Sequence, residues 1–177
     1  MKQSRAKQKP RGKKTRAKLE PLLSSGTHSG CTLQAYQQLI YPHTIDASEF
    51  VGSFCAKKIN FVHWEKAAEA AAHLLGGVVA TRDYATFRDC VAAADRIMGG
   101  ILNLKGKRGV HHVVCFKHNK KSGFTIYDSA KYHPYDVSDG RASSALFEGS
   151  SLMIVLEFPS LPKNKAVKGK PEVHEID

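Results

Sequence analysis

Residues 29–40 read Ser29-Gly30-Cys31-Thr32-Leu33-Gln34-Ala35-Tyr36-Gln37-Gln38-Leu39-Ile40. The apolar residues of this stretch recur at helical spacing, which predicts an amphipathic helix packed on a core. Cys31 stands at the start of that helix, where unpaired amide protons and the helix dipole favour a thiolate. The stretch therefore predicts a cysteine nucleophile, which needs a base elsewhere in the chain.

The candidate base lies in a predicted β-hairpin. Residues 110–117 read as a strand and residues 123–129 as its partner, with a polar turn between them. A hairpin centred near Lys120 places His112 opposite Asp128 on one face, where the carboxylate would orient the imidazole. A register shift of one residue would present His111 instead. Cys31, His112 and Asp128 are therefore the candidate nucleophile, base and orienting carboxylate.

Charge is unevenly distributed along the chain. The 177 residues carry a net charge of +11, and the first 18 contain nine Lys or Arg and no acidic residue. Such a block repels itself and is suited to non-specific contact with nucleic acid. We expect a basic tail over residues 1–22, one domain over residues 23–160 and a second tail over residues 161–177. No apolar run is long enough to span a bilayer, and the basic start of the sequence, with no apolar stretch behind it, leads us to expect no secretory signal.

The cysteines argue against a metal centre. Cys31, Cys55, Cys90 and Cys115 form no Cys-x-x-Cys pair, so neither a zinc site nor any other metal or cofactor site is expected. The last three stand among apolar neighbours and read as buried small hydrophobes. Unpaired thiols indicate a reducing compartment, the cytoplasm or nucleus.

The order of the predicted elements indicates an α+β fold. A capping box at Asp46 and Glu49 predicts a short helix. Helices are also expected over residues 63–75 and 87–98, closed by Gly76-Gly77 and Gly99-Gly100. Strands are expected over residues 101–104, 110–117, 124–128 and 152–158, so helices precede an antiparallel sheet.

Over roughly residues 25–158 the chain resembles papain-like cysteine peptidases, and among them the leader proteinases of aphthovirus type. Their nucleophile helix has the form Cys-x-Leu-x-Ala-x-x-Gln-Leu, matched here by Cys31, Leu33, Ala35, Gln38 and Leu39. Their second region is matched by His112-Val113-Val114-Cys115, the turn at Lys120, Tyr127-Asp128 and Tyr132-His133-Pro134-Tyr135. Peptidases of the C39 and Josephin types share this skeleton.

The resemblance implies a papain-like fold in which a helical part with the nucleophile helix packs on a C-terminal antiparallel sheet. It implies hydrolysis of peptide bonds through thiolate attack and an acyl-enzyme, without a cofactor, on a protein or on the viral or mobile-element polyprotein from which the enzyme releases itself. Two positions depart from the family pattern. Ser25 and Gly26 stand where an Asn or Gln supplies the second oxyanion donor, and Thr32 follows the nucleophile in place of an aromatic residue.

Two other functions fit the same sequence. One is a catalytically weak or inert papain-like module that binds RNA or anionic partners through residues 1–18. The other is a deubiquitinase-like peptidase, with the same chemistry on a ubiquitin-like substrate. Neither the substrate nor the oligomeric state follows from the sequence.

Overall fold

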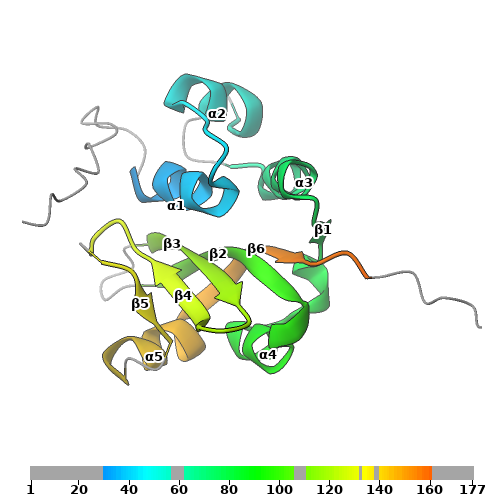
Figure 1. The fold of residues 1–177 in the computed structure, drawn as a ribbon. Coiled ribbons are helices and arrows are strands. Elements are labelled where there is room, and N and C mark those ends of the chain that lie inside the picture. The colour runs from blue at the N-terminus through cyan, green and yellow to red at the C-terminus, as the bar shows by residue number, and fades with distance from the viewer. Residues whose placement is uncertain (1–29, 57–61, 106–110, 132, 138–139, 161–177) are drawn as a thin grey trace, which may run out of the picture.

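The computed structural model describes residues 30–56, 62–105, 111–131, 133–137 and 140–160 (Figure 1). Within these ranges the chain has an α+β fold of α-helices and one six-stranded antiparallel sheet, as the sequence predicts. The tails expected over residues 1–22 and 161–177 lie outside the described residues.

The helices and strands are short. The α-helices are α1 (Gly30–Ile40), α2 (Ala47–Phe54), α3 (Trp64–Leu75), α4 (Phe87–Ala92) and α5 (Gly140–Glu148). The strands are β1 (Val78–Val79), β2 (Ile97–Lys105), β3 (His111–Asn119), β4 (Gly123–Tyr127), β5 (Tyr135–Asp136) and β6 (Ser150–Glu157), in the sheet order β1-β6-β2-β3-β4-β5. None of the helices in the described part is both long enough and apolar enough to cross a membrane.

The sheet separates two hydrophobic clusters. Helices α1 and α3 cover one face, and α4 and α5 lie on the other (Figure 1). Strand β3 alternates between the two: Val113 and Cys115 belong to the α1 cluster, whereas Val114 and Phe116 belong to the α4 cluster. A strand buried on both faces reads as a continuous apolar run, which is why residues 113–116 are apolar without a break.

The predicted helix starts and stops are largely confirmed. The Asp46 side chain accepts a hydrogen bond from the Glu49 amide over 2.8 Å and caps α2. Helix α3 ends at Gly76, whose φ of 66° is left-handed, a conformation that glycine adopts without steric cost. Helix α1 ends at Ile40, ahead of Pro42.

The helix expected over residues 87–98 is wrong in its second half. Helix α4 ends at Ala92, a 3-10 turn follows over Ala94–Arg96, and β2 begins at Ile97. Gly99 and Gly100 therefore lie inside a strand. A Cβ atom on Gly100 would lie 2.0 Å from the Ile154 carbonyl oxygen of β6. The glycines mark a close approach of two strands, not the end of a helix.

Three elements are not expected from the sequence, and two of them, β1 and α5, interrupt the expected order of helices followed by strands. Strand β1 lies between α3 and α4, and β5 and α5 lie between β4 and β6. The two strands have two residues each, which is too short for an alternating pattern to appear in the sequence.

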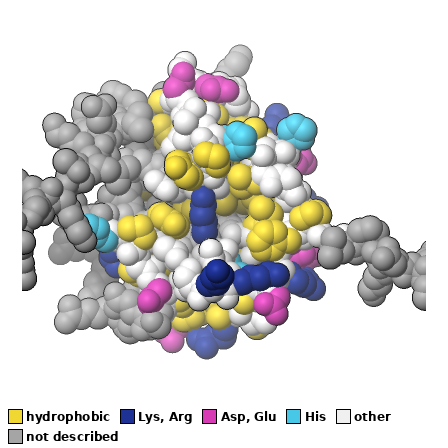
Figure 2. Space-filling view, viewed as in Figure 1, with side chains coloured by type: hydrophobic (Ala, Val, Ile, Leu, Met, Phe, Trp, Pro, Cys, Tyr) yellow, Lys and Arg dark blue, Asp and Glu magenta, His cyan; other side chains and the backbone are white. Residues whose placement is uncertain are grey.

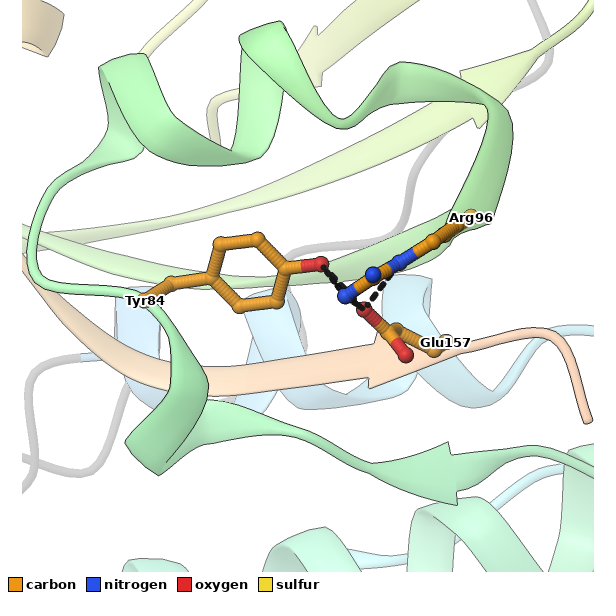
Figure 3. Close-up of polar contacts among 3 residues, drawn as sticks. All are labelled: Tyr84, Arg96 and Glu157. Atoms are coloured by element: carbon orange, nitrogen blue, oxygen red, sulfur yellow. Dashed lines mark hydrogen bonds and ion pairs between the residues drawn. The ribbon is translucent and has the colours of Figure 1, made fainter.

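A polar cluster ties the chain ahead of α4 to the end of β6 (Figure 3). The Tyr84 hydroxyl donates a hydrogen bond to the Glu157 carboxylate. Arg96 donates to Glu157 over 2.7 Å and to the Tyr84 oxygen over 2.9 Å. Burial and the hydrogen bond to Glu157 raise the pKa of Tyr84, so the phenol stays protonated and donates.

Candidate active site

Cys31 is the second residue of α1. It is partly buried and packs against the hydrophobic cluster between α1 and the sheet. Backbone amides in the first turn of a helix have no intrahelical acceptor, so they point toward whatever lies beyond the helix start. The position is the one that the sequence predicts for the nucleophile.

The His112 imidazole joins this thiol to a carboxylate. Its Nε2 atom lies 2.5 Å from Oδ1 of Asp128, and its side chain also hydrogen-bonds with Cys31. Because Nε2 is engaged by Asp128, the ring nitrogen left for the thiol is Nδ1. The structure thus brings together the three residues that the sequence singles out.

His112 meets Asp128 in a register one step from the expected one. The pairs Cys115–Tyr127 and Asn119–Gly123 centre the hairpin on Lys121, one residue past the predicted Lys120. Asp128 therefore follows the last paired residue of β4 and does not lie opposite His112. When the centre of the hairpin shifts by one residue, the residue opposite any given position changes by two. His112 and Asp128 therefore stay on the same face of the pleated sheet.

The contact with Cys31 forms where β3 extends beyond its pairing with β4. Within the described residues, β4 pairs with residues 115–119 of β3, and residues 111–114 of β3 have no partner on β4. The residues that share the His112 face of β3, Val114 and Phe116, belong to the cluster on the far side from α1. The imidazole therefore meets the start of α1 beside the strand and not across the sheet face.

His111 points the other way. It is exposed, and its Nδ1 atom lies 3.2 Å from Nδ2 of Asn103 on the neighbouring strand. Because successive side chains alternate along a strand, only one of the two histidines can face Asp128. That histidine is His112.

Asp128 is held by its own turn. Its Oδ1 atom also accepts a hydrogen bond from the Ala130 amide over 2.8 Å, and its side chain is only 8% exposed. An Asp directly after a strand often starts a turn, and Asp128 does so here while its carboxylate also contacts His112. The turn therefore fixes the orientation of the Asp128 carboxylate independently of its contact with the His112 imidazole.

The electrostatics of the site favour a charged imidazole. Hydrogen bonds with Asp128 and with Cys31 raise the pKa of His112 to about 10, despite an opposing effect of burial. Burial alone would raise the pKa of Asp128, but the hydrogen bonds from His112 and the Ala130 amide lower it overall. At neutral pH the arrangement is an imidazolium held between a carboxylate and a thiol that can lose its proton.

The other three cysteines lie in different surroundings. All four are thiols, and no disulfide joins them. Burial raises the pKa of Cys90 and of Cys115 to about 12, and it raises the pKa of Cys55. The prediction of buried small hydrophobes is confirmed for Cys90 and Cys115, whereas Cys55 is half-buried.

Several expected parts of the site fall outside the described residues. These are the positions that precede the nucleophile (Ser25, Gly26, Thr27 and His28), the basic block and Tyr132. Beyond Asp128, the Lys131 ammonium lies 3.6 Å from the Tyr135 ring centroid. Among the residues that are described, no group of three or more His, Cys, Asp or Glu side chains is arranged to hold a metal ion.

Comparison of the chain with protein-family models, with curated proteins and with solved structures finds no match. Only the sequence motifs carry the resemblance to papain-like peptidases. A catalytic role for this site is inferred from the contacts of His112 with Asp128 and Cys31.

Proposed function

We propose that this chain is a papain-like cysteine peptidase that hydrolyses peptide bonds with Cys31 as nucleophile, His112 as base and acid, and Asp128 as the orienting group. One observation carries the proposal: a single imidazole hydrogen-bonds both to the thiol at the start of α1 and to a buried carboxylate. A nucleophile, a base and a group that orients the base are the three parts of this kind of catalyst.

In the acylation step, the Cys31 thiolate attacks the carbonyl carbon of the scissile peptide bond, and the carbonyl electrons move onto its oxygen. In this mechanism the Cys31 backbone amide would donate one hydrogen bond to that oxyanion. The intermediate then collapses, the carbon–nitrogen bond breaks, and His112 gives its proton to the departing amine. A thioester on Cys31 and a neutral His112 remain.

In the deacylation step, His112 takes a proton from water while the water oxygen attacks the thioester carbonyl. Collapse of the second intermediate releases the carboxylic acid product and the Cys31 thiolate. His112 is protonated again, and the site returns to its starting charge. Asp128 keeps its charge throughout and stabilises the imidazolium.

The substrate class that we propose is a protein or a polyprotein, including self-release from a precursor. Helices that carry the nucleophile and pack on a sheet that carries the base support a papain-like arrangement. The four cysteines form no disulfide with one another, which supports work in a reducing compartment, where the Cys31 thiol stays reduced.

The test is covalent labelling by E-64, an epoxide that alkylates activated thiols of this enzyme class. The reduced full chain, His112→Ala and His111→Ala are labelled and mapped by intact mass and peptide mass spectrometry. We expect one adduct on Cys31, lost in His112→Ala and kept in His111→Ala. Cleavage of casein, lost in Cys31→Ser, tests the hydrolysis itself.

Absence of an adduct on Cys31 in the folded, reduced chain would refute the proposal. The basic block would then carry the function instead, as an RNA-binding or anion-binding module. In that case RNA affinity would survive Cys31→Ala, fall steeply with salt and disappear on deletion of residues 1–18.

A further inference from the structure

A pocket lies at the opposite end of α1 from the candidate nucleophile. It has a volume of about 150 Å³ and is lined by Leu39, Leu75, Met98, Gly99, Lys117 and Phe158. Eight residues separate Cys31 from Leu39, so the helix rise alone sets the two sites about 12 Å apart. The pocket is therefore distinct from the candidate active site, and nothing in the proposed peptidase mechanism uses it.

Lys117 is the one charged side chain of this lining. It is half-buried on the α1 face of β3, and its stem lies against Gly99, where an added Cβ would come within 3.5 Å of Lys117 Cγ. Its Nζ atom lies 5.8 Å from the Tyr41 ring centroid. Partial burial withdraws the ammonium from water and lowers the pKa of Lys117.

No carboxylate balances this charge in the described part of the chain. The ion pairs found there are Arg82–Glu65, Arg96–Glu157 and His112–Asp128, and Lys117 takes part in none of them. A partly desolvated ammonium without a counter-charge favours an incoming anion, because a pair excluded from water is stronger than an exposed one.

Two exposed hydrophobic side chains lie at this pocket: Phe158 is part of its lining, and the Tyr41 ring lies beside Lys117. Figure 2 shows yellow hydrophobic groups on both sides of a dark blue Lys or Arg side chain on the face viewed. Apolar side chains beside one cation fit a peptide segment in which carboxylates alternate with apolar side chains.

We propose that the Lys117 pocket binds residues 172–177 of this same chain. That segment reads Glu172-Val173-His174-Glu175-Ile176-Asp177, so three carboxylates are interleaved with two branched apolar side chains. It follows a stretch, residues 163–170, that contains four lysines and no acid. The acidic segment is thus the part of this sequence whose chemistry complements the pocket.

The chain can reach the pocket from where it leaves the sheet. Phe158 lines the pocket, and the described chain ends two residues later at Ser160. The eleven residues between Ser160 and Glu172 span at most about 40 Å when extended, several times the width of such a site. A tether of this length keeps the local concentration of the segment high, so that a weak contact suffices for occupancy. A second copy of the chain is a poorer occupant, because two bodies of net charge +11 repel each other.

The experiment is zero-length cross-linking with a water-soluble carbodiimide, which joins a lysine amine to a carboxylate only when the two are in contact. It uses the full chain with Cys31→Ala, so that proteolysis cannot remove the segment and the result does not depend on the proposed activity. We expect a cross-link from Lys117 to Glu172, Glu175 or Asp177 at least tenfold more abundant than cross-links from Lys120 and Lys121. These two lysines are exposed in the turn of the same hairpin and serve as matched controls.

A full-length variant with Glu172→Gln, Glu175→Gln and Asp177→Asn removes the charges of the segment. In it we expect loss of the cross-link and a several-fold faster reductive methylation of Lys117, with Lys120 unchanged. Equal cross-linking of Lys117 and Lys120 to the segment would overturn the proposal. So would cross-links that join ¹⁴N to ¹⁵N peptides in a mixture of labelled and unlabelled chains, since these would place the segment on another copy.

Discussion

The Nε2 atom of His112 lies 2.5 Å from Oδ1 of Asp128, and the same oxygen accepts a hydrogen bond from the Ala130 amide. A local turn two residues long thus fixes the carboxylate, and the carboxylate in turn fixes a ring from the neighbouring strand. The imidazole can then point its other nitrogen at Cys31 without losing side-chain entropy at the moment of reaction. The turn at the end of the hairpin therefore fixes the position of His112, the base in the proposed mechanism.

Replacing Asp128 by Asn removes the negative charge at the His112 contact while keeping the size of the side chain. The amide keeps the size of the carboxylate, but the hydrogen bond that contributes most to the raised pKa of His112 is weakened. We expect the pKa of His112 to fall toward its ordinary value, measured by NMR titration of the ring in the full chain. Peptide hydrolysis should fall by roughly 10² to 10⁴, as for loss of a group that supports acid–base catalysis.

His111→Gln is the matched control, since that ring lies beside Asn103 on the opposite side of the strand. It should leave both the titration of His112 and the hydrolysis rate unchanged. An unaltered pKa of His112 in Asp128→Asn would show that the carboxylate does not hold the ring.

Local sequence patterns predict the three site residues because each depends on short-range geometry. The start of a helix fixes where Cys31 lies, and strand alternation fixes the face of His112. The predicted hairpin centre is one residue off, yet this error preserves the face, because partners move in steps of two. The sequence therefore predicts which face of the strand His112 occupies more reliably than it predicts the pairing register of the hairpin.

The Gly99-Gly100 pair shows where such patterns fail. A glycine pair after an alanine-rich stretch is a helix stop in local terms, and at Gly76 that interpretation is confirmed. At Gly100 the deciding contact is with Ile154, more than fifty residues away in the sequence. Local sequence carries no information about that distant strand, so it indicates a cap where the glycine is a point of close strand contact.

The His112–Asp128 pair should make stability depend on pH in a defined direction. The pKa of folded His112 is raised to about 10, so its contribution to the free energy of unfolding is complete below about pH 6.5. That contribution is lost as pH rises toward 10. The pKa of Asp128 is lowered, so its contribution is present above its ordinary value of 3.8 and is lost as pH falls below it.

We therefore expect the difference in unfolding free energy between wild type and His112→Gln to be largest between about pH 4 and 6.5. By pH 10.5 the difference should shrink by a few kcal/mol at most, because a tenfold change in proton affinity corresponds to about 1.4 kcal/mol. Urea unfolding of both proteins at pH 5.5 and 10.5 measures it. A difference that grows with pH would contradict the charged pair, and His111→Gln controls for loss of an exposed imidazole.

Tyr84→Phe tests the cluster that holds the end of β6. The phenol donates to Glu157 and accepts from Arg96, so its loss leaves the carboxylate with Arg96 alone (Figure 3). We expect a loss of about 1–2 kcal/mol in the free energy of unfolding, since a hydrogen bond to a charged group is removed. Thermal unfolding measures the change.

Arg82→Gln is the contrast for this prediction, because it breaks a fully exposed ion pair with Glu65. Exposed pairs contribute little to stability, so its melting temperature should match that of wild type. Equal melting temperatures for wild type and Tyr84→Phe would show that the cluster does not secure the strand.

Gly100→Ala and Gly52→Ala should change the free energy of unfolding in opposite directions. At Gly100 the new methyl group would lie 2.0 Å from the Ile154 carbonyl oxygen and 2.6 Å from the Phe116 ring, so two strands must separate to admit it. At Gly52, inside the exposed part of α2, nothing lies within 4 Å of the new atom. Alanine there should stabilise the chain by about 0.5–1 kcal/mol through helix propensity and a less flexible unfolded state.

Gly100→Ala should instead cost about 3 kcal/mol or more, at the upper end of overpacking effects, or prevent folding. Chemical unfolding measures both variants, and circular dichroism reports whether Gly100→Ala folds at all. If Gly100→Ala were as stable as wild type, β2 and β6 would not approach each other as closely as the structure shows. The sheet would then have room for a side chain at position 100, where the structure shows β6 packed directly against the glycine.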